Sequence, residues 1–164
     1  MPKIYQMFID GQFVGAKNKA TREIKDPGSG EIIASVPESS REDVAHAILA
    51  ARRAFDSGPW RKTTAQDRGK ILFKIGDLIR ANSKMLAELE SRNNGKPLAE
   101  AEFDVADAAN CFEFYGGLAT KIHGETMNVP ANSLSFVVRE PLGVCGQIIP
   151  WNFPHGSIFM ARAG

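Results

Sequence analysis

Short apolar runs separated by turn residues occupy positions 1–37 of the chain, and this pattern predicts two antiparallel pairs of strands. In residues 5–14 the runs flank Asp10-Gly11, a dipeptide that accepts the positive φ angles of a two-residue hairpin turn. A second pair is predicted at 21–26 and 31–37, on either side of a Pro- and Gly-containing turn. The beginning of the chain is therefore expected to be sheet.

From residue 39 onward the apolar positions recur every three or four residues, which predicts helices. Ser39 stands three residues before Glu42, the spacing of a capping box, and Gly58-Pro59 ends this first helix. Thr64 is placed to cap a second helix, and a third is predicted over 83–94 after Asn82.

The fourth predicted helix is the longest. Gly95 favours the end of the third helix, and Pro97 suits the first turn of the fourth. An apolar stripe then follows with alternating spacings of three and four, which is typical of a packed scaffold helix rather than of an extended coiled coil. The stripe consists of Leu98, Ala101, Val105, Ala108, Phe112, Tyr115, Ala119 and Ile122.

Strand patterns return after Gly124. Residues 134–139 alternate in part, and residues 144–149 are almost continuously apolar, as expected of a strand covered on both faces. Such a strand needs neighbours on both sides, but the chain ends at Gly164 and offers few candidates. We therefore expect an incomplete chain that exposes apolar surface and that is unstable, self-associating or partly disordered alone.

Composition narrows the class of protein. The 164 residues are 43% hydrophobic and 24% charged with a net charge of +1, which fits one globular unit and gives no basic surface for nucleic acid. Asp10 and Gly11 interrupt the place of a signal peptide's apolar core, so we expect no secretion signal, and no run of 18 apolar residues predicts a membrane span. Two cysteines are too few for a disulfide framework, so we expect a soluble cytoplasmic protein.

The candidate chemistry lies at the end of the predicted buried strand, in the sequence PWNFP. Pro150 and Pro154 stiffen this turn and hold Asn152 between them. A rigid carboxamide at a strand end can donate to a developing oxyanion. The alternative is that Asn152 bonds to its own loop and that Trp151 belongs to the core.

The segment from Arg139 to Pro154, REPLGVCGQIIPWNFP, resembles the signature segment of the NAD(P)-dependent aldehyde dehydrogenase superfamily, and the nearest likeness is to betaine-aldehyde and general aldehyde dehydrogenases. Matching segments run in the family's order along nearly the whole chain. They are FIDGQFV at 8–14, DPGSGEIIASVP at 26–37, ARRAFDSGPW at 51–60, NNGKPLAEA at 93–101 and YGGLATKIHGE at 115–125.

The resemblance implies an α/β fold, the N-terminal part of an aldehyde dehydrogenase with its Rossmann-like cofactor domain cut short. It implies oxidation of an aldehyde to a carboxylate with NAD or NADP, with Asn152 as one half of the oxyanion hole. Residues lining the cofactor site would be Ile148, Ile149, Pro150, Trp151 and Asn152. Phe153 would line the aldehyde path.

The resemblance also divides the chain into three segments. Residues 1–125 would be hairpins and helices of the cofactor-binding domain, 126–140 an oligomerisation hairpin, and 141–164 the first part of the Rossmann-like core. The intact enzyme would be a homodimer or homotetramer. The alternative function is a catalytically incompetent homologue that acts as an assembly or binding partner.

Neither cysteine is expected to be the nucleophile. Cys145 lies within the predicted covered strand, where burial would raise the pKa of its thiol, and Cys111 lies beside apolar Phe112 on the long helix. The resemblance places the nucleophilic cysteine and the general-base glutamate downstream of PWNFP, so this chain would lack both.

Acidic side chains on the long helix, and a cation site near the first strands, are further candidates for binding. Asp104 and Asp107 share a helix face, either as a solvated edge or, by resemblance to aminoaldehyde enzymes, as contacts for a cationic substrate. The family often binds a monovalent cation near Ile24 and Lys25 with a carboxylate just before NGK. Here Asn93 stands in that place, so no metal is predicted.

Overall fold

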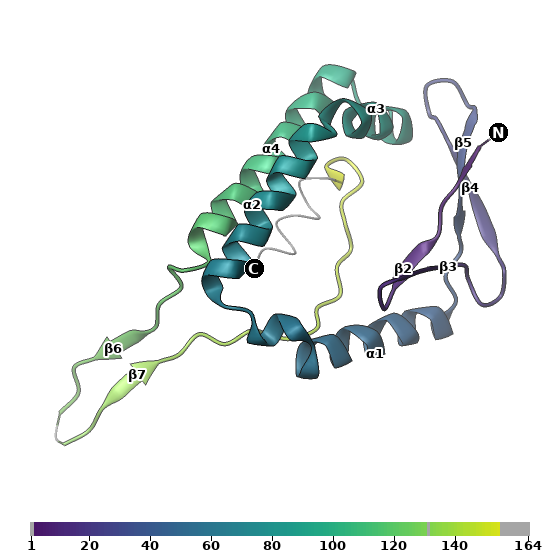
Figure 1. Ribbon diagram of the computed structural model, residues 1–164. Coiled ribbons are helices and arrows are strands. Elements are labelled where there is room, and N and C mark those ends of the chain that lie inside the picture. The colour runs from purple at the N-terminus through teal and green to yellow at the C-terminus, as the bar shows by residue number, and fades with distance from the viewer. Residues whose placement is uncertain (1, 131, 155–164) are drawn as a thin grey trace.

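The computed structural model describes residues 2–130 and 132–154. Figure 1 shows an open arrangement in which the N-terminal strands, one helix and a group of three helices follow each other around a central space. A hairpin projects from one corner, and the chain then returns past the short helix that follows the first long helix and through the centre toward the group of three helices. The site discussed below lies where this returning segment meets the helical group.

The N-terminal hairpin is confirmed. Strand β2 (Met7–Ile9) pairs antiparallel with β3 (Gln12–Val14), and the two turn residues have positive φ angles, 54° at Asp10 and 78° at Gly11. Aspartate tolerates this region better than most residues and glycine adopts it freely, which explains why the turn forms at this dipeptide.

The second predicted pair is also confirmed. Strand β4 (Thr21–Lys25) lies antiparallel to β5 (Ile32–Pro37). The sequence did not reveal β1 (Lys3–Ile4), which pairs parallel with β5 and makes the sheet order β1-β5-β4. A two-residue strand carries no periodicity, so its pairing depends wholly on tertiary contact.

Helix α1 (Arg41–Ser57) begins one residue later than predicted. Its cap is Ser40 rather than Ser39, and the reciprocal partner is Asp43 rather than Glu42. Asp43 accepts hydrogen bonds from the Ser40 backbone at 2.9 Å and from the Lys17 backbone at 3.3 Å. Asp43 is also buried, so the cap that fits the packing prevails over the neighbouring Ser/Glu pair with the same spacing.

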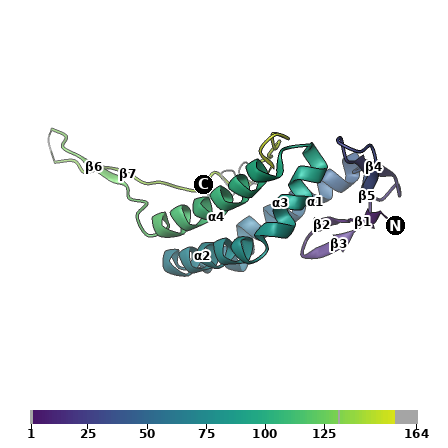
Figure 2. The same ribbon diagram turned by 90° about the horizontal axis from the view of Figure 1, so that it is seen from above.

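The short 3-10 helix η1 (Pro59–Lys62) leads into a group of three helices, α2 (Ala65–Ala81), α3 (Ser83–Asn94) and α4 (Leu98–Leu118). Thr64 caps α2 and Gly95 ends α3 with a φ angle of 81°, as predicted. Figure 2 shows α2 and α4 lying side by side. The core of this group contains Ile79, Ala87, Ala101, Val105, Ala109 and Phe112.

Helix α4 ends at Leu118, so the predicted continuation of its stripe to Ile122 is wrong. Gly116 and Gly117 fall in its last turn, where glycine disfavours the helical backbone, and Ile122 is exposed. Beyond it, β6 (Glu125–Met127) pairs antiparallel with β7 (Ser135–Val137) in the projecting hairpin, whose first strand begins one residue before the segment 126–140.

The predicted covered strand at 144–149 is wrong for this structure. Residues 138–150 have no regular secondary structure, and no strand of the described residues pairs with them. Side chains along the segment are exposed, 95% at Leu142 and 99% at Ile148. A strand needs a hydrogen-bonded neighbour, so an apolar run without one remains irregular, and the expected exposure of its apolar surface is confirmed.

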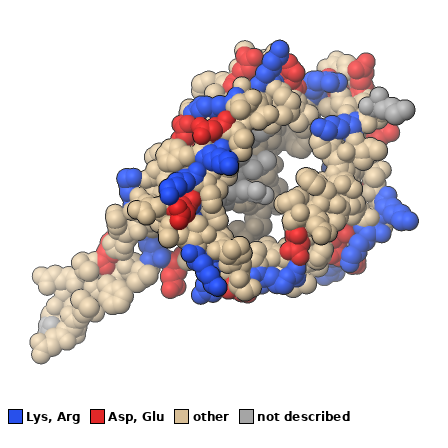
Figure 3. Space-filling view, viewed as in Figure 1, with Lys and Arg blue, Asp and Glu red and all other residues tan. Residues whose placement is uncertain are grey.

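Charged side chains of both signs are interspersed over the helices and strands in Figure 3, whereas the projecting hairpin is mostly uncharged.

Among the described residues, no helix is long and apolar enough to cross a membrane.

Candidate functional site

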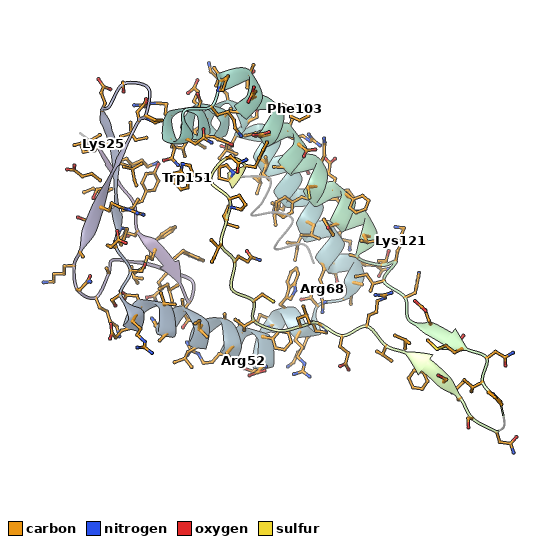
Figure 4. All side chains as sticks on the ribbon, turned by 180° about the vertical axis from the view of Figure 1, so that it is seen from behind. Lys25, Arg52, Arg68, Phe103, Lys121 and Trp151 are labelled. Carbon is orange, nitrogen blue, oxygen red and sulfur yellow. The ribbon has the colours of Figure 1, made fainter. Side chains whose placement is uncertain are left out.

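The loop between α3 and α4 and the turn at 150–154 face each other across a pocket of about 450 Å³. The two segments are more than fifty residues apart in sequence, and the returning chain brings them together. Figure 4 shows Trp151 next to the end of α3. The pocket is lined by Asn94, Gly95, Lys96, Pro97, Glu100, Trp151 and Asn152.

Asn152 is exposed and lines this pocket, and its carboxamide forms no hydrogen bond with any described residue. Trp151 is 60% exposed, so it is not a core residue. The alternative interpretation, a loop-bonded Asn152 beside a buried Trp151, therefore does not hold within the described chain. The two donors of the carboxamide remain available to a ligand.

The loop that opposes Asn152 is stiff. The backbone N–H of Lys96 donates to the Asn94 side chain at 2.8 Å, and the Ser91 hydroxyl donates to the Lys96 carbonyl at 2.7 Å. The Asn94 amide also donates to the carbonyl of Trp151, at the long distance of 3.5 Å. This last contact links the loop to the turn.

Lys96 is the most enclosed charged group at the pocket, with a side chain only 9% exposed. Its ammonium donates to Glu90 of α3 at 2.9 Å and to Asp104 of α4, and both carboxylates are buried. Burial lowers the pKa of Lys96, but the hydrogen bonds to Asp104 and Glu90 outweigh it and raise the pKa above its usual value. The two carboxylates therefore favour the charged form of Lys96.

The same ammonium lies 4.3 Å from the centre of the Phe153 ring. An ammonium at this distance over an aromatic face is attracted by the ring's negative charge density. Trp151 and Phe153, the residues before and after Asn152, are thus both contacted by the α3–α4 loop.

The structure separates the two acidic residues that were expected to act together. Asp104 is buried against Lys96, so neither a solvated edge nor an open substrate contact describes it. Asp107 is exposed one turn further along α4. Neither residue lines the pocket of Asn152, whereas Glu100 does.

The prediction that Cys145 is covered is wrong, because the thiol is exposed in the unpaired segment. It lines a separate, mostly apolar pocket of about 370 Å³ between β2 and α1. Cys111 is half-buried, and burial, followed by the nearby charge of Asp107, raises the pKa of its thiol. Neither cysteine lines the pocket of Asn152.

Sequence reasoning missed Lys96, Glu90 and Glu100. A usable signal was present for the first two, because Glu90 and Asp104 interrupt the apolar faces of two helices joined by a loop that carries Lys96. Carboxylates on apolar faces beside a lysine predict a buried ion cluster.

The backbone that the sequence analysis expects to line a cofactor site forms no strand in the structure. Residues 148–150 lead directly to the pocket in irregular backbone with Ile148 and Pro150 exposed. No group of three or more His, Cys, Asp or Glu side chains within 2–130 and 132–154 could hold a metal ion.

Comparison with known proteins identifies the family. A family model described as "Aldehyde dehydrogenase family" matches residues 13–163. The betaine aldehyde dehydrogenase of Bacillus subtilis is 50% identical over 149 residues, which cover 90% of this chain and 30% of that protein. An aldehyde dehydrogenase of Aspergillus niger is 45% identical over 148 residues, with the same coverage. The chain thus spans about 30% of the length of these relatives.

Solved structures agree. The NAD-dependent aldehyde dehydrogenase of Sinorhizobium meliloti superposes with a TM-score of 0.91 at 39% identity, over 97% of this chain and 32% of that one. A betaine aldehyde dehydrogenase variant of Staphylococcus aureus, solved in complex with NAD+, gives 0.91 at 43% identity, over 96% of this chain and 32% of that one. The α/β fold expected from the sequence is confirmed, and the chain belongs to the aldehyde dehydrogenase family.

Proposed function

We propose that this chain is part of an enzyme that oxidises an aldehyde to a carboxylate with NAD or NADP, and that Asn152 donates to the aldehyde oxygen during the reaction. The observation that carries the proposal is the Asn152 carboxamide, which lines a pocket and has no partner among the described residues. Family membership supports it, since the relatives named above are aldehyde dehydrogenases.

The chemistry needs a donor at this place. When a thiolate adds to the aldehyde carbon, the carbonyl oxygen gains negative charge, and a fixed N–H that points at it lowers the barrier. The bound nicotinamide supplies the hydride acceptor, and water then releases the carboxylate from the thioester. The stiff turn holds Asn152 before charge develops, so the donor needs no reorganisation.

In this function the described residues supply the hydrogen-bond donor, Asn152, but not the cysteine nucleophile. Cys145 lines a different pocket, and Cys111 has a raised pKa that disfavours its thiolate. The nucleophilic cysteine is therefore assigned to residues other than those described, and the family resemblance assigns the general-base glutamate to the same part of the enzyme.

The backbone from Ile148 to Asn152 is proposed as one wall of the cofactor site, with Phe153 on the side of the aldehyde. The NAD+ bound to the Staphylococcus aureus relative supports a nicotinamide cofactor in this family. Of the acidic pair, Asp107 remains the candidate contact for a cationic aldehyde, because Asp104 is engaged by Lys96. Replacing Asp107 by Asn tests this through KM for trimethylammonium and alkyl aldehydes.

The projecting hairpin is proposed as the assembly element of a homodimer or homotetramer. It exposes Leu134, Phe136 and Val138, a small apolar surface away from the rest of the molecule. Such surface favours burial against another subunit.

A hybrid enzyme tests the proposed activity. In it, the 149 aligned residues of the Bacillus subtilis betaine aldehyde dehydrogenase are replaced by those of this chain. We expect aldehyde-dependent formation of NADH or NADPH, followed at 340 nm, with turnover within about tenfold of the parent enzyme. A folded hybrid enzyme that binds NAD but oxidises no aldehyde would contradict the proposal.

A further inference from the structure

Lys96 occupies an unusual place, because one ammonium contacts two buried carboxylates and an aromatic ring of the PWNFP turn. Its partners Glu90 and Asp104 come from two different helices, and the ring belongs to Phe153. The two negatively charged carboxylates hold the ammonium in place, independently of its contact with the ring. A long lysine side chain is normally mobile, and here its end is fixed.

This fixed cation is not available as a ligand for substrate or cofactor. Its side chain is only 9% exposed, and its donors are directed to Glu90 and Asp104. Removing it would leave two buried carboxylates without its charge, a change that strongly destabilises proteins. The Lys96 ammonium contacts the turn through the face of the Phe153 ring.

Within the described residues, the turn at 150–154 has two contacts with the α3–α4 loop. Trp151 and Phe153 are half or more exposed, and the segment 138–150 before them pairs with no described strand. One contact is the Phe153 ring against the Lys96 ammonium, and the other is the 3.5 Å hydrogen bond from Asn94 to the Trp151 carbonyl. The contact with the fixed cation is made by the residue that directly follows Asn152, so we expect it to contribute to the position of Asn152.

We propose that Lys96 is a positioning residue for Asn152, holding the turn through the Phe153 ring while Glu90 and Asp104 hold Lys96. This inference rests on the proposed function, because it concerns how the donor is aimed. The cluster thus connects the packing of α3 against α4 to the geometry of the oxyanion donor.

The test uses the hybrid enzyme with Lys96→Met, Lys96→Arg and Phe153→Leu. Misplacing a catalytic group by about 1 Å costs up to roughly a hundredfold in rate, so we expect kcat to fall about tenfold in Lys96→Met and in Phe153→Leu. KM for the cofactor should change little. Lys96→Arg should recover most of the loss, because a guanidinium keeps the charge and stacks on the ring.

A second background separates positioning from general damage. If Lys96 acts through Asn152, the Lys96→Met and Phe153→Leu effects on kcat should almost vanish in an Asn152→Ala enzyme. Equal losses in both backgrounds would overturn the inference. Phe153→Leu keeps the buried charges intact, and because Phe153 is also proposed to lie on the aldehyde side, the loss of its effect in the Asn152→Ala background carries the test if Lys96→Met does not fold.

The matched control is Phe103→Leu, because Phe103 is an exposed ring at the start of α4 (Figure 4). It should leave kcat unchanged, and a Phe153→Leu effect no larger than that of Phe103→Leu would also overturn the inference. Failure of the proposed function looks different, because Asn152→Ala would then keep full activity. In that case the thermal-unfolding coupling between Lys96 and Phe153 still tests the contact itself, and an absent coupling rejects it.

Discussion

At the scale of single residues, the candidate site combines the Asn152 carboxamide, which lines the pocket, with the Lys96 ammonium, which lies 4.3 Å from the centre of the neighbouring Phe153 ring. Two prolines in a five-residue segment indicate a stiff turn, and a carboxamide between them indicates a donor. Lys96 could not be placed from local pattern, because its partners lie on two helices and its ring partner is 57 residues away. Contacts of that range arise only from the tertiary fold.

The two cysteines give a prediction at the same scale. In the isolated 164-residue chain, Cys145 is exposed and Cys111 is half-buried with a raised pKa, so iodoacetamide at pH 7.5 should modify Cys145 about tenfold faster or more. Peptide mass spectrometry over time measures both rates. Equal rates before denaturation, or faster labelling of Cys111, would show that one of the two environments is wrongly described.

At the scale of elements, the local signals predicted most of the helices and the first hairpin. Turn dipeptides, caps and the Gly95 stop act within a few residues, so they can be read from sequence. The sequence did not predict β1, the one-residue shift of the α1 cap, the end of α4 at Leu118 or the irregular backbone at 144–149. For β1, the α1 cap and 144–149, contacts outside the element decided the outcome, whereas α4 ends where Gly116 and Gly117 fall in its last turn.

The cap of α1 can be tested by two adjacent serines. The Ser40 hydroxyl accepts a hydrogen bond from the Asp43 backbone N–H at 3.3 Å and donates one to the Asp43 carboxylate at 2.8 Å. Because Ser40→Ala removes both hydrogen bonds, it should lower the free energy of unfolding of the hybrid enzyme's helical region by about 1 kcal/mol. Ser39→Ala is the control, since within the described part of the chain the Ser39 hydroxyl donates to the Met7 sulfur and not to a backbone group of α1. Urea unfolding followed by far-UV circular dichroism measures both. A larger loss in Ser39→Ala would favour the cap predicted from sequence.

The packing of α2 against α4 can be tested by two glycines. A methyl group at Gly69 would lie 2.7 Å from the Gly116 carbonyl oxygen, so Gly69→Ala should destabilise the protein by about 1–3 kcal/mol. Gly117→Ala meets no atom within 4 Å and should be neutral or stabilise by up to about 1 kcal/mol. Thermal unfolding of both variants gives the comparison. The same loss in both would mean that the two helices do not approach this closely.

At the scale of the whole molecule, the chain exposes far more surface than its size requires. Its accessible area is 12155 Å², whereas a compact monomer of 17.9 kDa would expose about 8,000 Å². The open arrangement in Figure 1 and the exposed apolar segment at 142–149 account for much of the difference. Exposed apolar surface of this kind favours burial against other protein.

The isolated chain should therefore associate with itself. We expect light scattering after size-exclusion chromatography to show a mass that rises with concentration between about 5 and 200 μM, and a hydrophobic dye to bind strongly, because exposed apolar patches of this size favour burial. A concentration-independent monomer with one sharp, reversible thermal transition would contradict the expectation.

The central claim is that the Asn152 carboxamide stabilises the oxyanion of an aldehyde, and Asn152→Ala in the hybrid enzyme tests it most directly. Removing one such donor costs about 10²–10³ in kcat, so we predict a fall of that size with an unchanged unfolding temperature. A folded Asn152→Ala enzyme whose kcat stays within about threefold of the unmodified hybrid enzyme would contradict the account.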